Sequence, residues 1–111
     1  MSGFILLEKF EVAIENIYII LRQFPKHEKH AFAADIKQTA WNLYRLIVEY
    51  VRKYHKKTTL NRMDVELDVL KAQIRMAHKR FKYIPFDKYQ RISEKLVEVG
   101  RMIGGLHKSV G

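Results

Sequence analysis

The stretch LNRMDVELDVLKAQIRMAHKRFKYI (residues 60–84) decides the fold class of this 111-residue chain. Its apolar residues recur at alternating steps of three and four, which is the spacing of one face of an α-helix. Acidic residues near its start and basic residues near its end complement the helix dipole, and Pro85 marks a boundary. The stretch therefore predicts an amphipathic helix over about residues 60–83. Its apolar positions are Leu60, Met63, Leu67, Leu70, Ile74, Ala77, Phe81 and Ile84.

The same alternation of apolar residues continues on both sides of this stretch. Pro25 separates two further helices on the N-terminal side, and Thr59 is expected to cap the third helix. Helices joined by connections of a few residues run antiparallel to their neighbours. We therefore predict one all-α domain over residues 1–111, an antiparallel up-down-up-down four-helix bundle. The predicted helices cover about residues 4–24, 27–54, 60–83 and 86–106.

The first two predicted helices carry more apolar surface than one bundle core needs. Ile19 and Ile20 widen the apolar face of the first helix, and Trp41 and Tyr44 begin a second stripe on the next one. Surplus apolar surface of this kind is typical of contacts with other subunits. We therefore expect a homo-oligomer, and the alternative is a wide core within one subunit.

The composition excludes several classes of protein. The chain has no cysteine, which excludes disulfides and thiolate chemistry. Its longest strongly apolar run, residues 12–21, is interrupted by Glu15 and Asn16 and is too short to span a bilayer. The N-terminus lacks the basic start and the small-residue cleavage site of a signal peptide. We therefore expect a cytoplasmic protein without a membrane partner.

Catalytic and metal-binding patterns are missing from the sequence. A di-metal bundle site needs paired Glu-x-x-His motifs, and His27 and His30 in HEKH have no third ligand beside them. The serines and threonines have no histidine and acid at a recognisable spacing, and no phosphate-binding glycine loop follows a strand. We therefore expect no metal, no cofactor and no enzymatic activity. The other histidines, His55, His78 and His107, are interpreted as surface residues or minor nucleic-acid contacts.

Basic residues are the remaining signal. Lysine and arginine outnumber aspartate and glutamate by 21 to 12, which gives a formal net charge of +9. These residues recur at helical spacing near the end of the second helix, along the third helix and at the start of the fourth. Such stripes suit the neutralisation of phosphates, and the alternative is an ordinary charged helical exterior. The candidate nucleic-acid-binding residues are Arg45, Arg52, Lys53, Lys56, Lys57, Lys71, Arg75, Lys79, Arg80, Lys82, Lys88, Arg91 and Lys95.

The segment GRMIGG (residues 100–105) is unusual because glycine inside a helix costs roughly 1 kcal/mol relative to alanine. Gly100 and Gly104 lie one turn apart on the same face. We expect them to let a neighbouring helix backbone come close, in the same bundle or in the next subunit. Gly105 is expected to end the helix in a left-handed C-cap. The alternative is that the glycines only fray the helix end.

The chain resembles a known family over nearly its whole length, most specifically in the GRMIGG segment. The stretches QFPKHEKHAFAADI (residues 23–36) and VEVGRMIGGLHKS (residues 97–109) resemble the accessory variability determinant (Avd) proteins of diversity-generating retroelements. They are also similar to four-helix-bundle proteins encoded in intervening sequences of bacterial ribosomal RNA genes. The resemblance assigns structural roles to Phe24 and Pro25 and to the Gly100–Gly105 segment. Leu106 departs from the pattern, since members of this group often carry tryptophan there.

The resemblance implies a ring-like assembly of four-helix bundles, namely a homopentamer. It further implies association with a reverse transcriptase and its template RNA, with DNA as another ligand, in support of error-prone complementary-DNA synthesis. The accessory protein itself performs no chemistry in that system. The alternative implied by the second group is a structural or interaction protein without a retroelement role.

Overall fold

The segments with helical spacing of apolar residues form long helices in the structure. The computed structural model describes residues 2–52 and 57–110, and no strand occurs among them. The expected all-helical class with four helices is thereby confirmed. The helices are α1 (Ser2–Leu21), α2 (Phe32–Arg52), α3 (Lys57–Lys79) and α4 (Phe86–Val110), with a short 3-10 helix, η1 (Lys26–Glu28), between α1 and α2.

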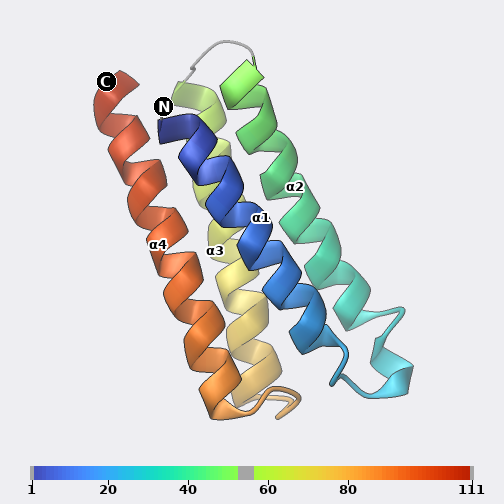
Figure 1. The fold of residues 1–111 in the computed structure, drawn as a ribbon. Helices are drawn as coiled ribbons and strands as arrows, with labels where there is room; N and C mark the ends of the chain where they lie inside the picture. Colours follow the sequence, from blue (N-terminus) through green and yellow to red (C-terminus); the bar gives the residue numbers. More distant parts are fainter. Residues whose placement is uncertain (1, 53–56, 111) are drawn as a thin grey trace.

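The four helices lie side by side in a body about 42 Å long (Figure 1). Each helix packs against two others: α1 contacts α2 and α4, and α3 contacts the same two helices. Figure 1 shows the two chain ends at one end of the molecule and the α1–α2 and α3–α4 connections at the opposite end. These two connections are therefore close neighbours although they are distant in the sequence.

The core contains most of the positions that the helical spacing predicts. On α3, residues such as Leu60, Met63 and Leu70 are fully buried. Phe81 differs from its prediction, because α3 ends at Lys79 and the Phe81 side chain stays 44% exposed. The largest fully buried side chains are Phe10, Leu6, Ile17, Ile36, Leu43, Ile47, Leu60, Met63, Leu70, Ile74, Ile84 and Ile92.

The start of α2 differs from the expected residue 27. Pro25 is followed by η1, in which the N–H of Glu28 donates to the Pro25 carbonyl at 2.9 Å. This turn delays the α-helix to Phe32. The buried Phe24 ring contacts Phe32 at 5.9 Å and Tyr83 at 5.1 Å between ring centroids. The Phe24–Pro25 turn therefore joins the two connections at this end of the molecule.

The end of α3 also differs from the sequence prediction. Lys82 has a φ of 61° and is the only non-glycine residue with positive φ in the described part of the chain. The N–H of Tyr83 donates to the Ala77 carbonyl at 2.8 Å, which satisfies a carbonyl of the last turn of α3. The left-handed residue of this fold is thus Lys82 in the α3–α4 connection.

The glycines of α4 do not all behave as expected. Gly105 does not end the helix, because α4 continues to Val110 and no described glycine has positive φ. A Cβ at Gly100 would lie 3.3 Å from Leu67 Cδ2, so the close approach is to a side chain and not to a backbone. A Cβ at Gly104 would meet no atom within 4 Å. The sequence analysis overlooked Gly3, where a Cβ would lie 3.1 Å from Val51 Cγ2.

Thr59 does not cap α3, which already begins at Lys57. Its buried hydroxyl instead donates to Glu49 Oε2 at 3.2 Å, which joins α3 to α2. None of the described helices is long and apolar enough to cross a lipid bilayer.

Candidate nucleic-acid interface

The basic residues of α3 border a groove between α3 and α4. Lys71 and Arg75 line this groove of about 170 Å³ from α3, and Tyr89, Ser93 and Val97 line it from α4. None of the described residues that line it is acidic, and neither cation forms an ion pair with another described residue. Lys79 continues the same row one turn beyond Arg75 and is exposed. The α3–α4 edge therefore presents positive charge without a bound carboxylate.

The candidate residues of α4 do not line this groove. Lys88, Arg91 and Lys95 fall on the other flank of α4, which faces α1. This direction follows from Glu98, one turn beyond Lys95, which pairs with Lys9 of α1 at 3.7 Å. The structure thus places the α3 and α4 candidates on two different surfaces.

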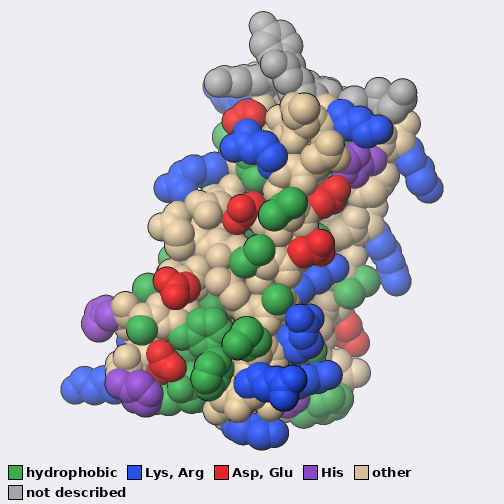
Figure 2. Space-filling view, turned by 180° about the vertical axis from the view of Figure 1, so that it is seen from behind, with side chains coloured by type: hydrophobic (Ala, Val, Ile, Leu, Met, Phe, Trp, Pro, Cys, Tyr) green, Lys and Arg blue, Asp and Glu red, His purple; other side chains and the backbone are tan. Residues whose placement is uncertain are grey.

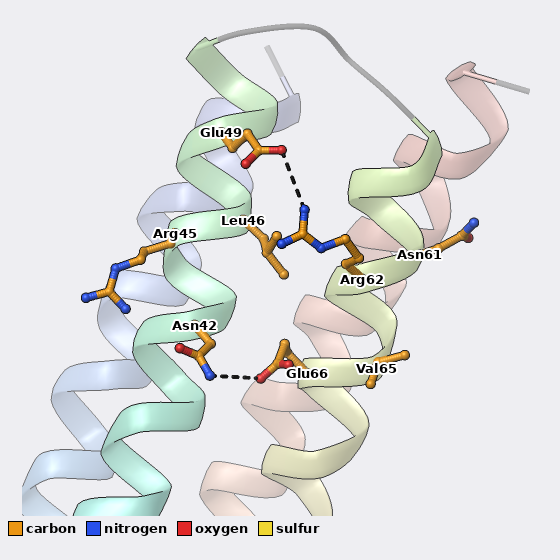
Figure 3. Close-up of a pocket in the computed structure, with 8 residues that line it drawn as sticks. All are labelled: Asn42, Arg45, Leu46, Glu49, Asn61, Arg62, Val65 and Glu66. Atoms are coloured by element: carbon orange, nitrogen blue, oxygen red, sulfur yellow. Dashed lines mark hydrogen bonds and ion pairs between the residues drawn. The ribbon is translucent and has the colours of Figure 1, made fainter.

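The candidates near the end of α2 are dispersed. Arg45 borders a groove of about 620 Å³ between α2 and α3, and its side chain points away from that groove (Figure 3). Glu49 and Glu66 line the same groove, and Arg62 of α3 reaches toward Glu49 with an N–O distance of 4.0 Å (Figure 3). The carboxylates therefore offset the positive charge here. The sequence analysis did not single out Arg62.

The remaining candidates lie at the two ends of the molecule. Arg52 ends α2 and Lys57 begins α3, at the end opposite the α3–α4 connection (Figure 1). Lys53 and Lys56 lie outside the described residues. Arg80 and Lys82 are exposed on the α3–α4 connection itself.

Two histidines that were interpreted as surface residues instead link α3 to α4. His78 donates from Nδ1 to the Ile84 carbonyl at 2.7 Å, because a carbonyl oxygen can only accept, and its ring stacks on Tyr89 with centroids 4.4 Å apart. His107 Nε2 lies 2.8 Å from Asp64 Oδ2. Each histidine directly follows a buried core residue in the sequence, and that position at the border of the apolar face is the signal that was missed.

A groove of opposite character lies between α1 and α2. Its volume is about 830 Å³, and its lining combines apolar side chains with three glutamates and one arginine. Val12 and Ile19 remain 47% and 45% exposed beside it, and Trp41 remains 36% exposed. The structure therefore leaves part of the apolar surplus of α1 and α2 uncovered. The groove is lined by Glu8, Glu11, Val12, Ile14, Glu15, Tyr18, Ile19, Arg22, Trp41 and Tyr44.

Hydrogen bonds fix the polar groups around this groove. The Tyr44 hydroxyl donates to Glu11 Oε2 at 2.8 Å, and the Trp41 indole N–H donates to the Tyr18 hydroxyl at 2.9 Å. The hydrogen bond to Glu11, followed by burial and the Glu11 charge, raises the pKa of the Tyr44 hydroxyl above its ordinary value. The groove is thus a pre-formed acidic and apolar surface.

The chain as a whole was compared with known proteins. The model of a family described as bAvd-like matches residues 4–110, which include almost all of the four helices. The chain belongs to the bAvd-like family. This membership confirms the resemblance to Avd proteins that the two sequence segments indicated. No curated protein matches the chain.

The main structural features of this bAvd-like chain lie within the residues that the family model matches. The Phe24–Pro25 turn, the Gly100–Gly105 segment and the Lys71–Arg75 edge all lie inside residues 4–110. Among the described residues of this bAvd-like chain, no group of three or more His, Asp or Glu side chains could hold a metal ion. The described surface thus offers charged edges and grooves as its candidate sites.

Proposed function

We propose that this chain is a non-enzymatic accessory protein of a diversity-generating retroelement. In this role it binds the reverse transcriptase and its template RNA, or DNA, through basic helix faces and supports mutagenic complementary-DNA synthesis in the cytoplasm. Membership in the bAvd-like family supports the accessory role. The observation that carries the nucleic-acid part is the Lys71–Arg75 edge, where no described carboxylate neutralises the cations.

The proposed working form is a ring-like homopentamer of antiparallel up-down-up-down bundles. The acidic and apolar α1–α2 groove suits a second copy of this chain, because the net charge of each copy is +9. A second exposed apolar stripe lies on α3, which does not contact α1. Contacts between two different faces of successive copies form a ring when the rotation between copies closes, as the proposal requires. The α3 stripe is formed by Val65, Val69 and Met76.

A ring would strengthen the attraction for a polyanion. Five chains would carry about +45 in total, and a field of this size raises the association rate of nucleic acid. Because phosphate contacts release counterions, the affinity must fall steeply with salt. The protein would contribute by holding the template strand and the polymerase close together on one scaffold.

The test is charge reversal on the α3 edge. We expect Lys71→Glu, Arg75→Glu and Lys79→Glu together to lower the RNA affinity and to reduce the slope of log affinity against log salt by about 2, since single strands release about 0.7 ion per phosphate contact. The matched control reverses three exposed cations elsewhere, namely Lys26, Arg101 and Lys108. It changes the net charge equally.

Equal losses in the two triple variants would show that only net charge matters and would contradict an interface at the α3 edge. Failure of the wild-type protein to bind RNA or DNA at low salt would contradict the proposed function itself. The polymerase contact has its own test, which is copurification of the wild-type protein with a reverse transcriptase from the same genome. Failure to copurify would contradict that part of the proposal.

A further inference from the structure

Two phenylalanines near the α3–α4 connection are exposed to solvent. Phe81 is 44% exposed, and Phe86, the first residue of α4, is 62% exposed. An exposed large aromatic ring keeps apolar surface in contact with water, so its burial by a ligand is favourable. These two rings therefore differ from Phe10 and Phe24, which are buried in the core.

Neighbouring rings hold Phe81 in place. It lies nearly parallel to Tyr83, with a centroid distance of 5.4 Å and an interplanar angle of 15°, and it meets Phe32 edge-on at 5.5 Å. The Tyr83 hydroxyl in turn donates to Glu28 Oε2 at 2.8 Å. Because its support is fixed, Phe81 loses little conformational freedom when a planar group stacks on it.

Phe86 has a similar support on the α4 side. Its ring lies 5.9 Å from His78, which stacks on Tyr89 and is fixed by the hydrogen bond to Ile84. The two exposed phenylalanines thus extend two ordered aromatic groups at the same end of the bundle.

Positive charge surrounds these rings. Residues 22–35 and 79–91, which form this end of the molecule, contain eight Lys and Arg against three Asp and Glu. Figure 2 shows hydrophobic side chains gathered toward the lower end of the molecule, with Lys and Arg side chains beside and below them. Lys79, Arg80 and Lys82 flank Phe81 in the sequence and are exposed.

Lys82 has the left-handed backbone conformation common where a helix ends. Its φ of 61° lies in the left-handed region, which is unfavourable for an L-residue and which glycine adopts readily. Here the strained position carries a lysine next to the exposed Phe81 ring.

We propose that unpaired RNA bases stack on Phe81 and Phe86 while Lys79, Arg80 and Lys82 bind the adjoining phosphates. This inference rests on the proposed RNA binding and specifies its ligand as single-stranded segments. Aromatic platforms beside basic residues are how proteins hold single strands without reading sequence. A duplex cannot use such platforms, because its bases are already stacked on one another.

The decisive variant is Phe86→Ala, because Phe86 is the more exposed ring. The probes are a 12-nucleotide oligouridine, an abasic strand of the same length and an RNA duplex. One base–aromatic stack contributes about 1–3 kcal/mol, so we expect roughly 5- to 150-fold weaker binding of oligouridine and unchanged binding of the abasic strand. The matched control is Phe4→Ala, since Phe4 is 56% exposed but lies near the N-terminus.

Two further variants separate stacking from folding. Phe86→Trp keeps the binding of oligouridine, and the tryptophan fluorescence that it adds is quenched by oligouridine but not by the abasic strand. Lys82→Gly raises the free energy of unfolding by relieving the left-handed strain and lowers the affinity for both single strands. Stability and binding then move in opposite directions, which unfolding could not produce.

Equal wild-type affinities for oligouridine and the abasic strand would overturn the stacking proposal and leave the proposed function intact. A change of subunit number in Phe86→Ala, with unchanged oligouridine binding, would also overturn it and would assign this end to a protein contact. If the wild-type protein bound none of the three probes, the proposed function would fail together with this inference.

Discussion

The α1–α2 pair and the α3–α4 pair are built alike but carry opposite charge. In each pair a glycine lies against a side chain of the neighbouring helix, Gly3 against Val51 and Gly100 against Leu67. The α1–α2 groove, however, is lined by three glutamates and one arginine, whereas Lys71 and Arg75 line the α3–α4 groove without a described acid. Similar packing therefore supports two different kinds of surface.

This difference shows why a net charge alone does not identify an interface. The value of +9 averages over an acidic groove and a basic edge. Apolar side chains beside carboxylates suit a protein partner, while aromatic side chains beside lysine and arginine suit a nucleic acid. The two helix pairs therefore present surfaces of different chemical character.

The largest effect is expected from placing charge in the apolar part of the α1–α2 groove. Val12→Lys together with Ile19→Lys should dissociate the proposed assembly, because two further ammonium groups would replace apolar contacts and face a copy whose own net charge is +9. Light scattering should then report the 13.3 kDa mass of one chain. Phe86→Lys, which changes an even more exposed residue near the α3–α4 connection, should leave the mass unchanged.

If Phe86→Lys dissociated the assembly and the groove variant did not, the assignment of partners to the two helix pairs would be reversed. A single-chain mass for the wild-type protein would show that no second copy of the chain binds the α1–α2 groove.

An intermediate effect is expected from the glycines of α4. Gly100→Leu should lower the free energy of unfolding by about 1–3 kcal/mol, because its Cβ alone would already crowd Leu67 and overpacking strains a core. Gly104→Ala should raise it by about 1 kcal/mol, since no atom lies within 4 Å and alanine favours the helix. Urea unfolding measures both values. A Leu variant at position 100 as stable as the parent would contradict close packing of α3 and α4.

The smallest effect is expected from two tyrosines, one in each region. The hydrogen bond to Glu11 raises the pKa of Tyr44, and the hydrogen bond to Glu28 raises the pKa of Tyr83, both above the ordinary 10.0. Above pH 10 the unfolded tyrosines ionise first, so the unfolded state binds fewer protons and stability falls with rising pH. The stabilisation is complete below pH 10.

Tyr44→Phe and Tyr83→Phe should each reduce the loss of stability between pH 10 and pH 11. The stability is measured as the urea midpoint at each pH relative to its value at pH 8. Burial also raises the pKa of Tyr50, which is present in all variants and therefore contributes equally to the pH dependence of each. An identical decline in the wild-type protein and in the double Phe variant would show that neither carboxylate contact matters.

The sequence by itself determined the helices and most of the core. Steps of three and four place residues such as Leu67, Leu70 and Ile74 on one helix face, and burial of that face is the main driving force of folding. The sequence also indicated the family, and the match of the bAvd-like family model to residues 4–110 confirms it. Periodicity is a local property, so a linear reading can recover it.

Only the tertiary structure decided where charges and rings meet. It placed Lys71 with Tyr89, turned Lys95 toward α1, and brought the Phe24 turn onto Tyr83 in the other connection. Such proximity depends on how helices are rotated and on where they end, as the early end of α3 and exposed Phe81 demonstrate. These features arise from contacts between residues far apart in the chain, which local spacing does not encode.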